Sequence, residues 1–170
     1  MACLLTTGYQ LGCRDSIGGI QEIYIANFSS GATYSLDAND NITGVGGVTA
    51  SYYTFEQEME TGQFDQTGEY STEMGTVFFT QDVTVMLHKN DAALRNQLLV
   101  LSQANMSVII LDQRGEYWLI GYQNGVRTTA GAMNTGKAFG DMNGVTITLQ
   151  GKEPEPAYRI DDISIFTITV

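Results

Sequence analysis

The chain has 170 residues, of which 43% are apolar, and a formal net charge of −11. This length and composition suit one hydrophobic core, so we expect a single domain over residues 1–170 and exclude a disordered chain. No apolar run approaches the roughly 18 residues of a membrane span, and the opening residues lack the pattern of a signal peptide. We therefore expect a soluble protein that is made in the cytoplasm.

The two cysteines of the chain, Cys3 and Cys13, set limits on metal and redox chemistry. They lack the second pair that a zinc site needs, and their spacing is not that of a Cys-x-x-Cys redox motif. We expect both to be reduced, structural thiols.

The negative charge is concentrated in one segment. Residues 15–88 contain no Lys or Arg, whereas the rest of the chain balances eight acids against eight bases. The eleven acids of this segment are Asp15, Glu22, Asp37, Asp40, Glu56, Glu58, Glu60, Asp65, Glu69, Glu73 and Asp82. About half of the protein should therefore present a field of one sign.

The first elements in chain order are predicted on either side of a polar turn. Residues 37–41 form a cluster of Asp and Asn, which favours a turn after a strand at 32–36 and before another that begins at Ile42.

The stretch that follows, 49–74, carries a period of two. Glu56, Glu58 and Glu60 would share one face of an extended chain, and Phe55 and Met59 would share the other. One interpretation is a solvated edge strand whose charges block aggregation. The other is a long hairpin over 49–88, apolar on one face and acidic on the other, that neighbouring subunits complete.

Residues 75–88 alternate as a half-buried strand does. One parity is apolar except at Gln81, and it contains Val77, Phe79, Val83, Val85 and Leu87.

A single helix is predicted over 90–104. Asn90 or Asp91 can cap its first turn, and Leu94, Leu98 and Leu101 fall on one stripe that would cover a sheet face.

Strands resume after the helix. Residues 106–111 and 116–122 flank a turn at 112–115 and predict a hairpin, and Asn124-Gly125 begins another turn. Residues 145–149 and 163–170 predict two further strands. This order favours a mainly β fold, a β-sandwich or partly closed barrel with one packed α-helix and a long protruding hairpin.

The motifs that carry chemistry are weak, so we expect no enzyme, no cofactor and no metal. Residues 131–138 match a phosphate-binding loop except that Ala138 replaces the Ser or Thr that holds magnesium. Ile42 replaces the glycine that a calcium loop of the 37–41 type requires. His88, the only histidine, has no nucleophile motif nearby, and no carboxylate pair is singled out. Specific binding of nucleic acid needs more Lys and Arg than the chain has.

With its base-free hairpin candidate at 49–88, its single helix and its strand-rich remainder, the chain resembles the major tail tube proteins of tailed bacteriophages. Residues 115–149 also resemble a stretch of phage virion structural proteins. The resemblance implies a β-sandwich flanked by a helix, with a hairpin that joins those of neighbouring subunits around a negatively charged lumen. It implies hexameric rings, stacked as a tube in the virion, through which DNA passes without specific binding during ejection.

The same resemblance suggests site residues and partners. It implies that the lumen is lined by Glu56, Glu58, Glu60, Asp65, Glu69 and Glu73, and that subunits touch through Phe55, Met59, Phe64, Tyr70 and Met74. The partners would be further copies of the chain and other phage tail or neck proteins, with no membrane. Two alternatives remain open: another virion ring or decoration protein, such as a tail terminator, neck or head component, and an acidic extracellular β domain that binds calcium or another ligand.

Overall fold

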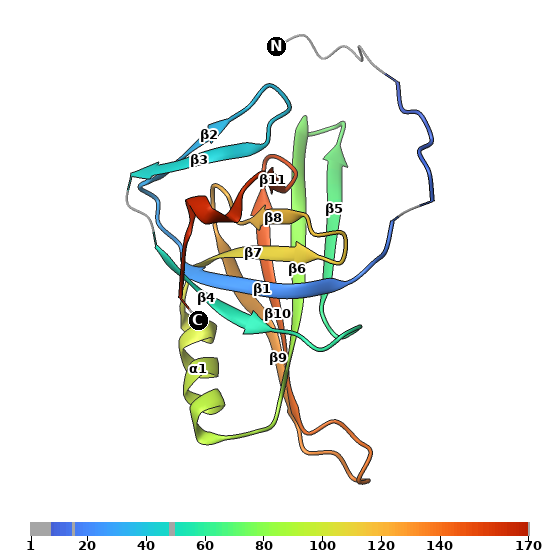
Figure 1. Ribbon diagram of the computed structural model, residues 1–170, viewed down its shortest axis with the longest axis vertical. Helices are drawn as coiled ribbons and strands as arrows, with labels where there is room; N and C mark the ends of the chain where they lie inside the picture. Colours follow the sequence, from blue (N-terminus) through green and yellow to red (C-terminus); the bar gives the residue numbers. More distant parts are fainter. Residues whose placement is uncertain (1–7, 15, 48–49, 170) are drawn as a thin grey trace.

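The computed structural model describes residues 8–14, 16–47 and 50–169. The protein is mainly β, with 52% of residues in strands and 9% helical, and the described residues contain one α-helix. The strands form one large mixed sheet that is not closed into a barrel (Figure 1). This arrangement confirms the predicted mainly β, sandwich-like class.

The elements of the described residues follow one another in a simple order. They are β1 (Ile20–Asn27), β2 (Ala32–Leu36), β3 (Ile42–Gly47), β4 (Ser51–Glu56), β5 (Gln63–Ser71), β6 (Thr76–His88), α1 (Ala92–Gln103), β7 (Met106–Asp112), β8 (Tyr117–Ile120), β9 (Val126–Asn134), β10 (Gly144–Glu153), β11 (Tyr158–Ile160), the 3₁₀ turn η1 (Ile163–Ile165) and β12 (Thr167–Thr169). No helix in these ranges combines the length and the apolar content that crossing a membrane requires.

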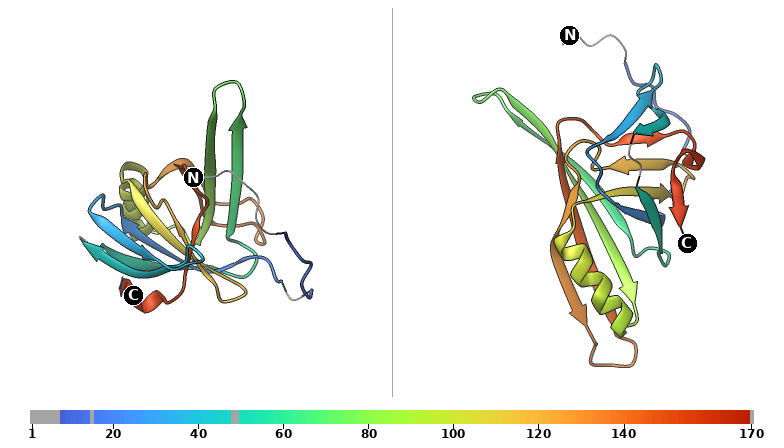
Figure 2. Two further views of the ribbon diagram at one scale, coloured as in Figure 1. Left: turned by 90° about the horizontal axis from the view of Figure 1, so that it is seen from above. Right: turned by 90° about the vertical axis from the view of Figure 1, so that its left-hand side faces the viewer.

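The sheet folds over itself into layers. Its strand order is β2-β3-β11-β8-β7-β9-β10-β6-β5, and β1 branches from β7 to carry β4, which in turn pairs with β12. The long strands β9, β10, β6 and β5 run across the shorter β1, β7 and β8, and α1 lies beside β9 and β10 (Figures 1 and 2). Strands that cross at a large angle are typical of an orthogonal sandwich.

The core lies on both faces of the central β1–β7 pair. On one face, Ile23, Val108 and Ile110 belong to a cluster that continues through β6, β10 and α1. On the other face, Tyr24 and Ile109 belong to a second cluster with residues of β3, β4, β8 and β11. A strand that is buried on both faces is apolar at consecutive positions, which explains the continuous apolar run in β7.

Most strands that periodicity predicts are present. β6, the β7–β8 hairpin and the strand at 145–149 are confirmed, the last as part of β10. The turn at 37–41 is confirmed as well, because Asp37 Oδ1 accepts hydrogen bonds from the backbone N–H groups of Asn39 and Asn41, each at 2.8 Å.

Two terminal predictions need correction. Residues 163–170 do not form one strand, because Asp162 caps a 3₁₀ turn at 163–165 and only 167–169 are extended, while Val170 lies outside the described residues. Cys13 is an exposed free thiol, so it is not structural. Cys3 also lies outside the described residues.

The predicted extent of the hairpin was wrong. β4 does not pair with β5 or β6, because it pairs with β1 on one side and β12 on the other. Only β5 and β6 form the long hairpin, from Gln63 to His88. Thr49, the expected first residue, is outside the described part of the chain.

The helix begins where its cap residue predicts. The backbone N–H of Leu94 donates to Asp91 Oδ1 at 2.7 Å, so Asp91 rather than Asn90 is the N-cap. Leu94 and Leu101 are buried and Leu98 is half-buried against the first core cluster, which confirms the predicted stripe.

Replacing the cap tests how much it stabilises the helix. Asp91→Ala leaves the N–H of Leu94 without its acceptor and should lower the free energy of unfolding by about 1 kcal/mol. Asp91→Asn retains an acceptor oxygen and should stay within a few tenths of a kcal/mol of the wild type. Urea unfolding of the three proteins measures both effects, and equal losses in the two variants would contradict the capping role.

Candidate functional site

The β5–β6 hairpin projects from the body of the protein (Figure 2). Its strands pair without a break from Gln63 opposite Thr84 to Ser71 opposite Thr76. On the other side of β6, β10 ends opposite Phe79, so residues 69–78 pair only with one another. The outer half of the hairpin is therefore a two-stranded ribbon, and such a ribbon gains little stability unless another surface packs against it.

The hairpin has one acidic and one more apolar face. The strand register places Asp65, Glu69 and Asp82 on the first face, and it places Phe64, Tyr70, Val77 and Phe79 on the second. Tyr70 and Phe79 pack edge to face with ring centroids 6.4 Å apart. The predicted division into an acidic and an apolar face thus applies to β5 and β6.

Like charges lie opposite each other on the acidic face. Asp65 is directly across from Asp82, a pairing that destabilises a sheet. Amides rather than cations contact the two carboxylates: Gln63 Nε2 donates to Asp65 Oδ2 at 2.6 Å, and Gln150 Nε2 donates to Asp82 Oδ1 at 2.8 Å. These two carboxylates therefore keep their negative charge, while a base of β10 on the same side of the sheet, Lys152, lies over the ring of Phe78 at 5.3 Å from its centroid.

Three of the predicted lumen residues, Glu56, Glu58 and Glu60, lie outside the β5–β6 hairpin. Glu56 ends β4, directly opposite Glu22 of β1. Glu58 and Glu60 belong to the connection between β4 and β5, where Glu60 has a φ of 63°. The expectation that all three share one face of a strand was wrong, because the chain leaves the extended conformation after Glu56.

The predicted subunit contacts divide into two groups. Phe55 and Phe64 pack against the protein's own first core cluster, so they stabilise the monomer. Met59, Tyr70 and Met74 are exposed and remain available. Glu73 is exposed next to Met74 in the turn between β5 and β6.

A buried glutamine anchors the base of the hairpin. Gln81 is 1% exposed, its Oε1 accepts from the N–H of Gly121 at 3.3 Å, and its Nε2 donates to Gln66 Oε1 at 3.3 Å. The same oxygen of Gln66 accepts from the N–H of Ala157 at 2.8 Å. These bonds join both hairpin strands to the residue after β8 and to the loop before β11. The polar residue that interrupts the apolar pattern of β6 therefore helps to fix the register of the hairpin.

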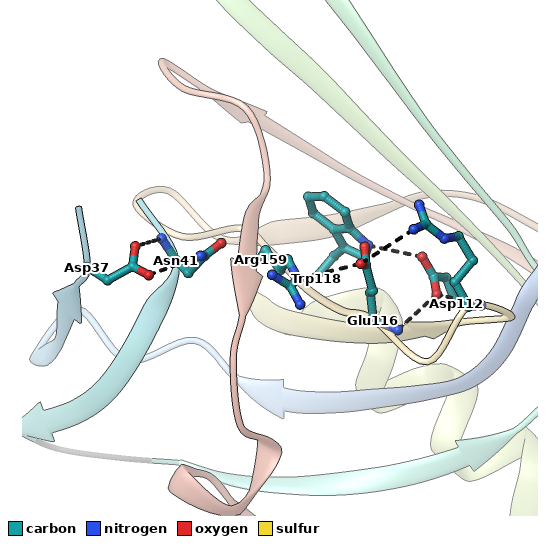
Figure 3. A network of polar contacts seen from close by, with 7 residues as sticks. Asp37, Asn41, Asp112, Glu116, Trp118 and Arg159 are labelled. Atoms are coloured by element: carbon teal, nitrogen blue, oxygen red, sulfur yellow. Dashed lines mark hydrogen bonds and ion pairs between the residues drawn. The ribbon is translucent and has the colours of Figure 1, made fainter. Parts of the chain in front are cut away.

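Two arginines lie next to an acid near the β7–β8 turn (Figure 3). Arg114 and Arg159 each approach Glu116 Oε1 at 3.9 Å. Asp112 accepts from the N–H groups of Arg114 and Glu116 and from Trp118 Nε1, at 2.8, 3.0 and 3.3 Å. These contacts close the β7–β8 turn, and the charges of the two arginines are offset locally.

The weak motifs are used by the fold itself. In the loop that resembles a phosphate-binding loop, the N–H groups of Lys137 and Ala138 both donate to Asp141 Oδ2 at 2.8 Å, and these bonds lower the pKa of Asp141. The N–H of Asn41, with that of Asn39, lowers the pKa of Asp37. His88 is exposed at the end of β6. No three His, Cys, Asp or Glu side chains gather as metal ligands in the part of the chain that the structure describes.

Comparisons with known proteins leave the geometry as the main guide to function. No protein-family model matches the chain, and no curated protein or solved structure matches it.

A buried carboxylate, Glu153, has no counterpart in the sequence predictions. It accepts hydrogen bonds from the N–H groups of Gln123 and Asn124, the latter at 2.8 Å, and so holds the turn between β8 and β9. Burial raises the pKa of Glu153 above its usual 4.5, although the backbone N–H groups oppose this effect.

The raised pKa of Glu153 predicts a pH dependence. A carboxyl group with a higher pKa in the folded state binds its proton more tightly there, so its contribution to stability is full below pH 4.5 and is lost as the pH rises through the folded pKa. Glu153→Gln removes this titration. The free energy of unfolding of the wild type minus that of the variant should fall from pH 4 to pH 7 in urea titrations, and a difference that stays constant or grows would contradict the assignment.

The anchoring role of Gln81 predicts a large effect from one substitution. Gln81→Leu keeps the volume but leaves the buried N–H of Gly121 without an acceptor, which should cost about 2 kcal/mol of the free energy of unfolding. Thr67→Val, at an exposed position of β5, should change stability by less than about 0.5 kcal/mol. Urea unfolding distinguishes the two, and a Gln81→Leu variant as stable as the wild type would show that the network is dispensable.

Proposed function

We propose that this chain is a structural subunit, not an enzyme, that assembles into rings stacked as a tube with an acidic channel for DNA. The observation that carries the proposal is the β5–β6 hairpin, which projects from the core with a face that carries acids and no base. The resemblance to phage tail tube proteins supports the same function. In that setting the protein is made in the host cytoplasm and becomes part of the virion, in contact with other tail or neck proteins.

An acidic wall suits a passage for DNA for a physical reason. Each contact between a cation and a phosphate releases counterions and adds affinity, so a basic wall would hold the duplex in place. An acidic wall repels the backbone and leaves the duplex free to slide. This function gives a use to like charges that destabilise an isolated hairpin.

The edges of the sheet offer a route to a closed ring. β5 is the last strand in the sheet order, and its outer edge has no partner among the described residues. An exposed edge is a template for pairing with another chain, and a ring of paired hairpins would leave no free edge. We place Asp65, Glu69 and Glu73 at the lumen, and Tyr70 and Met74 at contacts between neighbouring hairpins.

Electron microscopy of the purified protein at high concentration tests this assembly directly. The proposal expects hexameric rings that stack into tubes, with a hole wide enough for duplex DNA. Single rings that never stack would favour a terminator or neck component instead. The proposal would be overturned by a chain that stays monomeric at every concentration, even when fragments of assembled tube are added to initiate growth.

Charge reversal on the hairpin tests the lumen. Asp65→Lys with Glu69→Lys should leave assembly intact but make the tubes retain duplex DNA at about 50 mM salt and release it by about 200 mM, because new phosphate contacts are salt-dependent. The control is Glu58→Lys with Asp161→Lys, which makes the same change of charge at exposed sites outside the projecting half of the hairpin. Retention of DNA in sedimented tubes is the measurement, and equal retention by both variants would contradict the placement of the hairpin at the lumen.

A further inference from the structure

An open groove lies between β4 and α1. Its volume is about 810 Å³, and core residues such as Phe55, Leu101 and Met106 line its floor. Val100 of α1 and Tyr53 of β4 line it as well and are exposed. The groove is thus an opening of the first core cluster to solvent.

Among the described residues, the backbone of β4 beyond Tyr53 is paired on one side only. β12 pairs with β4 only as far as Thr169 opposite Tyr53. Beyond that point, residues 54–56 pair with β1 on one side, and no strand of the described residues pairs with their other side. An extended segment laid along residues 54–56 would add a strand to the sheet and would rest on α1.

The chain itself contains a segment of matching chemistry. We call residues 8–14 and 16–19, which precede β1, the leading arm; all of its residues are exposed. Tyr9, Leu11 and Cys13 alternate with Gln10, Gly12 and Arg14, which is the pattern of a half-buried strand. Yet Tyr9 and Leu11 are 88% and 89% exposed, so the apolar side of this pattern has no partner within the monomer.

Charge and geometry favour the arm of another copy. Arg14 is the last base before the base-free segment, and Glu56 lies at one end of the groove. Residues 54–56 pair with Tyr24, Ile23 and Glu22, two to four positions along β1 from Ile20, where the arm of the same copy begins. To reach their other side, that arm would have to turn back around the end of β4. Figure 1 shows the arm on the side of the molecule away from α1.

We propose that the leading arm of one copy binds as an added strand along residues 54–56 of a second copy, with Tyr9 and Leu11 in the groove between β4 and α1. The inference deepens the self-association in the proposed function and rests on it. Arm and groove are different surfaces, so the contact is head to tail wherever two copies do not exchange arms, and a head-to-tail contact generates a ring when the rotation closes.

Cross-linking in the full-length chain tests this contact. In a Cys3→Ser background, Cys13 of the arm is paired with Val100→Cys in the groove and treated with a short bifunctional maleimide. The expected product is a ladder of covalently linked copies under denaturing conditions. The matched control is Leu99→Cys, which is as exposed as Val100 (57% against 62%) but lines a different groove, and it should give little ladder.

A second variant shows whether the arm binds through its apolar side. Leu11→Asp, in an exposed segment that the fold does not need, should reduce cross-linking at Val100→Cys about tenfold, because it removes the burial of one large side chain. Leu11→Met should retain it. Equal ladders from both cysteine positions, links formed only within one chain, or no effect of Leu11→Asp would each overturn the inference.

Microscopy of the same samples separates the two proposals. Rings or tubes that form without links at Val100→Cys would overturn the arm contact and leave the proposed tube standing. Linked copies that never form rings would support the arm contact and count against the tube.

Discussion

Burial of the β1–β7 pair on both faces is the constraint on which the other parts of the molecule depend. An apolar strand pair in the middle of the molecule needs a covering layer on each side. β6, β10 and α1 cover one face, and β3, β11 and the C-terminal turn contribute to the cluster on the other. β6 belongs to this covering layer through Val83 and Val85, so the hairpin that it forms with β5 is fixed to the core at one end and projects at the other.

The projecting end of the hairpin is not explained by the stability of the monomer. Its residues 69–78 include Glu69 and Glu73, neither of which forms an ion pair within the described residues, and its apolar face exposes Tyr70 and Val77. Like charges on one sheet face destabilise, and exposed apolar groups gain nothing from solvent. At the base, by contrast, three hydrogen bonds of Gln81 and Gln66 fix the strands. A segment that is held firmly at its base and unsatisfied at its tip is suited to contacts outside the monomer.

The parts of the fold that could be predicted from the sequence are those that depend on nearby residues. The N-cap at Asp91, the apolar stripe of α1 and the Asp37 turn are local features, and each lies where the pattern indicates. The alternation in β6 was also sufficient to place a strand. In these cases the partner of a residue lies within a few positions along the chain or on a face that periodicity defines.

The remaining parts depend on contacts that no local pattern contains. Acidic residues alternate with other residues over 55–60, past the end of β4 at Glu56. This alternation therefore could not reveal that the chain turns after Glu56. Gln81 and Glu153 are buried because distant backbone groups need acceptors, and the positions of Gly121 and Asn124 follow only from the fold. The polar residue in an apolar strand was the available signal for Gln81; Glu153 at the end of β10 gave none.

Two of the unpaired edges among the described strands, those of β5 and β4, differ in a way that bears on assembly. β5 carries acids, which discourage non-specific pairing with other strands. Pairing between two hairpins remains possible in a register that places their charges toward a common lumen. The edge of β4 is short and is recessed beside α1, so only a narrow extended segment fits along it. Contacts of these two kinds do not compete, because they use different edges of the sheet. A subunit that pairs through β5 with one hairpin and through β4 with one arm would contact neighbouring copies at two separate places. Two contacts restrict the rotation between copies more than one does. They therefore favour a closed ring over an open fibre.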